Sequence, residues 1–280
     1  MQVFETKKDL QDYLFKKSQQ NLTIGFVPTM GALHEGHLSL IKKAQKKNNL
    51  IVVSIFVNPT QFNNPEDLIK YPKTLKNDIT LLESIHCDVL FSPPVHELYT
   101  DKVLATSFNF DGLEHQMEGK FREGHFDGVG TIVKTLFEIV KPKNAYFGEK
   151  DFQQLQIIKQ MVLKHQLPIK IKGGKIFREK DGLAMSSRNA ALLMEYRKAA
   201  PFIFKILKKA KKRFSTQNPD EVTRWVEKQF KKHPLLKLEY FTIADQKTLK
   251  TAHLKESNQQ YRAFIAVFAD KIRLIDNIQL

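Results

Sequence analysis

The stretch that decides the fold of this chain is Pro28-Thr29-Met30-Gly31-Ala32-Leu33-His34-Glu35-Gly36-His37. An apolar run at residues 24–27 leads into it, and an amphipathic run at residues 38–44 follows it. This order predicts a strand, a glycine-containing turn and a helix. Gly31 and Gly36 allow backbone conformations and close approaches that a Cβ would block.

The same turn offers groups that suit a bound anion. The peptide N–H groups that open a helix have no partner within the helix, so we expect them to be free for an anion. His34 and His37 add two imidazoles at this corner, which favours a nucleotide triphosphate. Other interpretations stay open, because the histidines also suit a metal ion, and His34 alone suits a helix cap or a packing position. Neither the dinucleotide-binding nor the Walker spacing of glycines is present.

Composition limits the class of protein. The chain has 280 residues, of which 42% are hydrophobic and 27% charged, as in an ordinary folded protein of one large or two smaller domains. No apolar run approaches a membrane span and no secretory leader is visible, so we expect a cytoplasmic enzyme with no membrane partner. The single cysteine, Cys87, enters a predicted strand and is expected to be a buried structural thiol.

The net charge of +15 could indicate nucleic-acid binding. The lysines are spread along the chain, however, and no RNA-binding motif interleaves them with aromatic residues. We therefore interpret the charge as solubility plus attraction for anionic substrates, and we predict no nucleic-acid partner. Retention on DNA at physiological ionic strength would support the alternative.

The order of elements predicts an α/β fold. A nearly continuous apolar run at residues 50–57 reads as a strand buried on both faces, and together with the first strand and helix it makes a parallel βαβ unit. Asn58 and Gln61 follow this strand, at the edge where ligands bind in parallel sheets; the alternative is a plain Asn-Pro turn. Residues 118–128 read as a functional loop, and residues 129–140 as a packed helix.

A second strand-to-helix turn, Gly148-Glu149-Lys150-Asp151, follows a predicted strand at residues 145–147. Lys150 can meet a phosphate as a point charge, whereas Asp151 can instead cap the helix. Gly173-Gly174 suggests a hinge, so we predict one domain over residues 1–176 and another over residues 177–280. In the second domain we expect a long basic helix at residues 190–214, broken or bent near Pro201, one further helix and three strands, which make a small α+β domain.

The second domain carries one more candidate phosphate site, Met185-Ser186-Ser187-Arg188. Two hydroxyls followed by a guanidinium suit a phosphate clamp. The alternative is an ordinary helix start with a serine as its cap.

With these residues in place, the chain resembles the pantothenate synthetase (pantoate–β-alanine ligase) family over essentially its full length. Each motif is modest alone, but all occur in the right order. The matching segments are residues 28–37, 58–62, Tyr71-Pro72, Arg122 with residues 124–126, Gly128-Val129, and residues 148–154, 181–189 and 273–277.

The resemblance implies a Rossmann-like, parallel-sheet nucleotidyltransferase domain and a smaller C-terminal α+β domain that closes over the active site. It implies condensation of (R)-pantoate with β-alanine through pantoyl adenylate, with ATP and Mg²⁺, by a homodimer. His37 matches the family's proton donor, and Gln61 and Gln154 match positions that bind pantoate, with Gln61 also reaching the β-alanine pocket. The implied ATP site comprises Met30, Gly31, Ala32, Leu33, His34, Glu35, Gly36, His37, Gly148, Glu149, Lys150, Asp151, Phe177, Met185, Ser186, Ser187 and Arg188.

Some points differ from the family pattern or stay open. Glu123 stands where proline is usual, Lys73 where arginine is usual, and Phe177 where a small aliphatic residue is common. The Mg²⁺ ligands are not assigned, although Asp78 and nearby acids are candidates. A different adenylate-forming enzyme is the nearest alternative, because the His-x-Gly-His signature resembles that of class I aminoacyl-tRNA synthetases. We also expect His37 to be mostly neutral in the free enzyme and to gain proton affinity when ATP binds.

Overall fold

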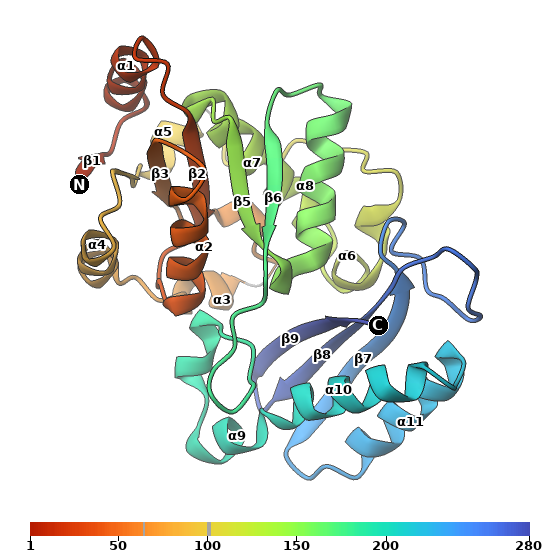
Figure 1. Cartoon of the computed structure of the whole chain (residues 1–280). Helices are drawn as coiled ribbons and strands as arrows, with labels where there is room; N and C mark the ends of the chain where they lie inside the picture. Colours follow the sequence, from red (N-terminus) through yellow and green to blue (C-terminus); the bar gives the residue numbers. More distant parts are fainter. Residues whose placement is uncertain (64, 100–101) are drawn as a thin grey trace. The chain divides into compact units, whose positions relative to one another are not determined.

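The computed structural model describes residues 1–63, 65–99 and 102–280 of the chain (Figure 1). These residues form two compact units. The first comprises Met1–Glu114, Glu118–Glu149 and Gln154–Lys175, and the second comprises His115–Met117, Lys150–Gln153 and Ile176–Leu280.

The first unit is built on a six-stranded parallel sheet in the order β1-β4-β3-β2-β5-β6. All six residues of β3 are buried, as the apolar run predicted. The Rossmann-like α/β architecture is therefore confirmed. The strands are β1 (Gln2–Phe4), β2 (Ile24–Thr29), β3 (Leu50–Ile55), β4 (Val89–Phe91), β5 (Asn144–Gly148) and β6 (Lys170–Gly174).

Helices cover both faces of this sheet because its four central strands are buried on both faces. Leu38 and Ile41 of α2 and Leu82 of α4 pack with Val27 on one face. On the opposite face, the ring of Phe137 in α7 meets Phe26 edge-on at a centroid distance of 6.2 Å. The helices of this part of the chain are α1 (Lys7–Ser18), α2 (Glu35–Gln45), α3 (Pro65–Lys70), α4 (Leu75–Ser84), α5 (Val95–Leu98), α6 (Met117–Phe121), α7 (His125–Val140) and α8 (Phe152–Lys164), with 3₁₀ turns η1 (Pro59–Gln61), η2 (Leu113–His115) and η3 (Glu149–Asp151).

The second unit is a three-stranded antiparallel sheet with helices, which confirms the predicted α+β class. Its strands are β7 (Leu236–Asp245), β8 (Tyr261–Ala269) and β9 (Ile272–Gln279), in that order across the sheet. Ile203 and Leu207 of α10 and Val222 and Val226 of α11 pack in one core with Ile265 of β8. The helices are α9 (Met194–Ala199), α10 (Phe202–Phe214) and α11 (Pro219–Lys231), preceded by η4 (Ser187–Ala191).

The predicted break near Pro201 is confirmed, because Pro201 stands between α9 and α10 as the N-cap of α10. One expectation needs correction. The supposed loop at residues 118–128 is largely helical, since α6 ends at Phe121 and α7 begins at His125. Gly173 and Gly174, where the sequence suggested a hinge, are the last two residues of β6, and the first unit ends one residue later, at Lys175.

Candidate active site

The carboxyl ends of the parallel strands bring the residues that follow β2 and β3, together with Gly148 and Glu149, to one edge of the first unit. The chain runs outward from β2 to β3 and β4 on one side, whereas β5 and β6 lie on the other side of β2. The strand order therefore reverses between the neighbouring strands β2 and β5, and open α/β sheets bind ligands at such a topological switch point. The turn at residues 30–34 between β2 and α2, called the signature turn here, follows β2 directly at this point, and Gly148 ends β5 with Glu149 next in the chain.

The signature turn has two successive residues in the left-handed region. Gly31, with a φ angle of 80°, adopts it without cost, whereas Ala32, with a φ angle of 49°, is strained there by its Cβ. The carboxylate of Asp78, in α4, accepts the backbone N–H of Ala32 at 3.0 Å and that of Leu33 at 2.8 Å. Asp78 is 1% exposed, so this contact is shielded from water. Both of its oxygens accept from the turn, so the structure gives Asp78 a structural role there.

The two histidines form the cap of α2. The ring Nδ1 of His34 accepts the N–H of Gly36 at 3.2 Å, and the ring Nδ1 of His37 accepts the N–H of His34 at 3.3 Å. The rings stack with their centroids 4.0 Å apart. The expectation that the helix-opening N–H groups are free for an anion is thus wrong for Gly36. Its N–H is already bonded to the imidazole of His34.

This cap determines the tautomer of His37. A ring nitrogen that accepts a hydrogen bond carries no proton, so the neutral ring must carry its proton on Nε2. In a neutral His37, Nε2–H is therefore the donor.

Gln61 is brought next to this turn. Its Nε2 donates to the sulfur of Met30 at 3.2 Å, and Asn58 donates to its Oε1 at 3.3 Å. Asn58 is buried, and Tyr99 donates to its Oδ1 at 2.6 Å. The structure thus joins residues of the loops after β2 and β3, and it shows Asn58 to be the support of Gln61.

The backbone of Gln61 is held from the start of α7. His125 Nδ1 lies 2.9 Å from the carbonyl oxygen of Gln61, and Arg122 donates to the same oxygen at 3.2 Å. A Cβ on Gly128 would lie 2.4 Å from the carbonyl oxygen of Thr60, so only glycine permits this approach. The sequence motif around residues 122–128 was the available signal, but it did not reveal that these residues act on Gln61.

The loop after β5 places Lys150 and Asp151 in η3. The Nζ of Lys150 lies 3.5 Å from a carboxylate oxygen of Asp151. Gln154 lies half-buried in the first turn of α8. Among the described residues, no hydrogen bond joins Gln154 to Gln61.

Within the second unit, Phe177 and Met185 are paired across a hairpin. The N–H of Met185 donates to the carbonyl of Phe177 at 3.0 Å, and Gly182, with a φ angle of 96°, supplies the turn. Burial raises the pKa of Asp181 in this turn, but the hydrogen bond from Arg197 and the N–H of Leu183 more than offset this and hold its pKa below the usual range. The hairpin is therefore fixed by local polar contacts.

Ser186 caps η4, because its hydroxyl accepts the N–H of Arg188 at 3.3 Å. The structure thus confirms the alternative interpretation, in which this segment starts a helical turn with a serine as its cap. The cap does not exclude a role for Ser187 and Arg188 in phosphate binding, because it engages only the backbone of Arg188.

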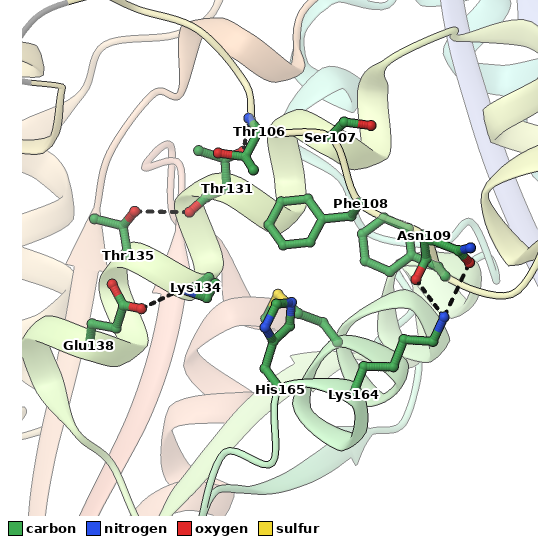
Figure 2. A pocket seen from close by; sticks show the side chains of 12 residues that line it. Thr106, Ser107, Phe108, Asn109, Thr131, Lys134, Thr135, Glu138, Lys164 and His165 are labelled. Atoms are coloured by element: carbon green, nitrogen blue, oxygen red, sulfur yellow. Dashed lines mark hydrogen bonds and ion pairs between the residues drawn. The ribbon is translucent and has the colours of Figure 1, made fainter.

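Two other features lie apart from these residues. A cavity of about 440 Å³ lies between α7, α8 and residues 106–110 (Figure 2). Its charged side chains are paired locally, as in the contacts of Lys134 with Glu138 and of Lys164 with Asn109.

Cys87 is buried, and burial raises the pKa of its thiol to about 12, which confirms the predicted structural thiol. Across the described ranges, no helix has the length and apolar character needed to span a bilayer.

Comparison with known proteins identifies the family. The family model for pantoate-beta-alanine ligase matches residues 2–279. The chain belongs to this family. It is 56% identical over 281 aligned positions to the pantothenate synthetase of Christiangramia forsetii, with 100% of this chain and 99% of the relative covered.

Solved structures of the family agree with the fold. Pantothenate synthetase from Thermus thermophilus superposes with a TM-score of 0.92 at 37% identity, covering 100% of this chain and 99% of that one. The pantoate-beta-alanine ligase of Francisella tularensis, solved as a complex with beta-gamma ATP and beta-alanine, gives 0.78 at 38% identity, covering 100% and 97%. From its membership of this family it follows that the chain catalyses the ATP-dependent condensation of pantoate with β-alanine, a reaction of pantothenate biosynthesis.

Proposed function

We propose that this chain makes (R)-pantothenate in two steps through a pantoyl-adenylate intermediate. In the first step, a carboxylate oxygen of pantoate attacks the α-phosphorus of ATP and diphosphate leaves. In the second step, the β-alanine amine attacks the activated carbonyl, AMP leaves and the amine loses a proton. Adenylation is needed because a carboxylate is a poor electrophile. The full-length family match is the observation that carries this proposal.

We propose that the ATP site is the set implied by the resemblance. The switch-point position of the signature turn supports this assignment for Met30 and the residues that follow it, up to His37. The remaining members are Gly148, Glu149, Lys150, Asp151, Phe177, Met185, Ser186, Ser187 and Arg188. Their main task is to position ATP and to stabilise charge on its phosphates.

We propose that His37 donates from Nε2 to the phosphate oxygens as negative charge builds up on them. Support comes from the cap, which fixes the donor tautomer before ATP binds. Gln61 and Gln154 are proposed to bind pantoate. The contacts of Gln61 with Met30 and Asn58 support its half of this assignment, since they place its amide beside the signature turn.

We propose that Mg²⁺ enters with ATP as part of the substrate. Mg²⁺ in nucleotide sites is held largely through phosphate oxygens and water. The engagement of Asp78 with the N–H groups of Ala32 and Leu33 agrees with this, because that carboxylate already has its partners.

A homodimer in the cytoplasm is also proposed, from the resemblance. Light scattering coupled to gel filtration should then give a mass of about twice 32.5 kDa. Fractionation of cells that produce the protein should recover it with the cytoplasmic fraction.

The deciding experiment measures AMP, diphosphate and pantothenate from ATP and pantoate, with and without β-alanine. The proposal predicts stoichiometric AMP and pantothenate with both substrates. With pantoate alone it predicts enzyme-bound adenylate, detectable as pantoate-dependent exchange of labelled diphosphate into ATP. Exchange that fails to appear, despite full turnover, would exclude the adenylate route.

A further inference from the structure

The last strand of the chain carries two adjacent buried polar residues that the proposed reaction does not use. Asp276 and Asn277, in β9, are 4% and 1% exposed. Successive side chains of a strand point to opposite faces of the sheet. The two side chains therefore meet different segments of the second unit.

Asn277 holds the segment that contains Lys150. Its Nδ2 donates to the carbonyl oxygen of Lys150 at 2.9 Å, and its Oδ1 accepts from Nη1 of Arg262 at 2.5 Å. The guanidinium of Arg262 lies 4.0 Å from the ring centre of Phe152, two residues beyond Lys150. The start of α8 is thus fixed to this sheet by a hydrogen bond and by a cation–π contact.

Asp276 holds the hairpin that runs from Phe177 to Met185. Its two oxygens accept from Nη1 and Nη2 of Arg178 at 2.6 and 2.9 Å, a bidentate pair. Arg178 also donates to the carbonyl of Gly182 at 3.1 Å, and its own backbone pairs with Ala184 across the hairpin. The carboxylate therefore restrains both arms of the hairpin.

We propose that Asp276 and Asn277 are positioning residues that set the two ATP-binding segments of the second unit from one strand end. This inference rests on the proposed function, in which Lys150 and the residues from Met185 to Arg188 contact ATP. Because the two residues are adjacent in β9, a displacement at this end of the strand shifts both segments together. Displacements of about 1 Å are large for groups that align a reacting phosphate.

The test measures the dissociation constant for MgATP by calorimetry, without pantoate, so that it does not depend on turnover. Asn277→Asp keeps the size of the side chain and its acceptor for Arg262 but loses the donor to Lys150. Arg178→Lys keeps the charge opposite Asp276 but loses the bidentate contact. We expect each variant to raise the dissociation constant about fivefold to tenfold, the effect of one lost hydrogen bond. If the added carboxylate of Asn277→Asp prevents folding, the dissociation constant of Asn277→Ser for MgATP is measured instead, with the same expected increase.

The matched control is Glu239→Gln. Glu239 pairs with Arg273 at 2.5 Å, so this change also breaks an ion pair of β9, away from Lys150 and the hairpin. It should lower thermal stability and leave the dissociation constant within twofold of wild type. The proposal is overturned if a folded Asn277 variant or Arg178→Lys binds MgATP as wild type does, or if Glu239→Gln weakens binding equally. A wild-type protein that binds MgATP but forms no AMP with pantoate would instead refute the proposed function.

Discussion

The contact between α7 and the loop that carries Gln61 can be tested with Gly128→Ala. The added Cβ would lie 2.4 Å from the carbonyl oxygen of Thr60 and 2.7 Å from the backbone nitrogen of Gln61. Both atoms are backbone, so no flexible side chain can move aside. An ordinary contact begins near 3.4 Å, and the loop and the helix must therefore separate by about 1 Å.

That separation should reach the substrate site. Misplacement by about 1 Å can cost about 100-fold in rate, which corresponds to about 2.7 kcal/mol of transition-state stabilisation. The loss should appear mainly in kcat/KM for pantoate, because Gln61 is the proposed pantoate ligand, and much less in the dissociation constant for ATP. The assay is AMP formation at varied pantoate with saturating ATP and β-alanine.

Gly130→Ala provides the matched control on the same helix. Its added Cβ would meet ring atoms of Phe108 at 3.0 Å and of Phe110 at 3.1 Å, and those rings can shift. We expect lower stability but kcat/KM for pantoate within about threefold of wild type. A folded Gly128→Ala protein with near-normal kcat/KM would refute the claim that this approach positions Gln61.

Four further outcomes are expected. Asp78→Asn should lose about 1.5–3 kcal/mol of unfolding free energy in denaturant titrations, because an amide cannot accept both N–H groups of the signature turn. His37→Ala should lower kcat by about 10²–10⁴ while circular dichroism stays native, as for a general acid. Cys87 should stay unreactive to thiol reagents at pH 8 until the protein unfolds, since burial raises its pKa to about 12. Burial lowers the pKa of His233 from 6.5, so the unfolded chain binds a proton at this residue before the folded chain does as the pH falls. The melting temperature should therefore fall between pH 7.5 and pH 5.5, and it should fall less in His233→Asn.

The sequence predicted those elements whose signals are local. The apolar run of β3 and the helical periodicity of residues 129–140 each lie within one segment, and both were placed correctly. β1 was missed because it has three residues, two of them exposed, and carries no pattern long enough to read. The start of α2 was placed three residues late, at Leu38 instead of Glu35, because histidine is not among the usual N-cap residues.

The supports of the site could not be predicted in the same way. Asp78 lies 45 residues from Leu33, and its spacing gives no sign that its carboxylate ends at that turn. Likewise, the motif residues Arg122 and His125 were visible, but their contact with the carbonyl of Gln61 depends on how α7 packs. Local pattern thus identifies groups that can meet a substrate, whereas the groups that hold them are determined by tertiary contacts.

Lys150 shows why a domain boundary drawn along the sequence can misplace a functional residue. Sequence order assigns it to the βα unit in which it lies, between β5 and α8. Its carbonyl oxygen instead accepts a hydrogen bond from Asn277, which is 127 residues away, and Arg262 lies over the ring of nearby Phe152. Contacts accordingly group Lys150–Gln153 with Ile176–Leu280. A substitution at Asp276 or Asn277 should therefore act through Lys150 and the hairpin, and not only as a remote effect on stability.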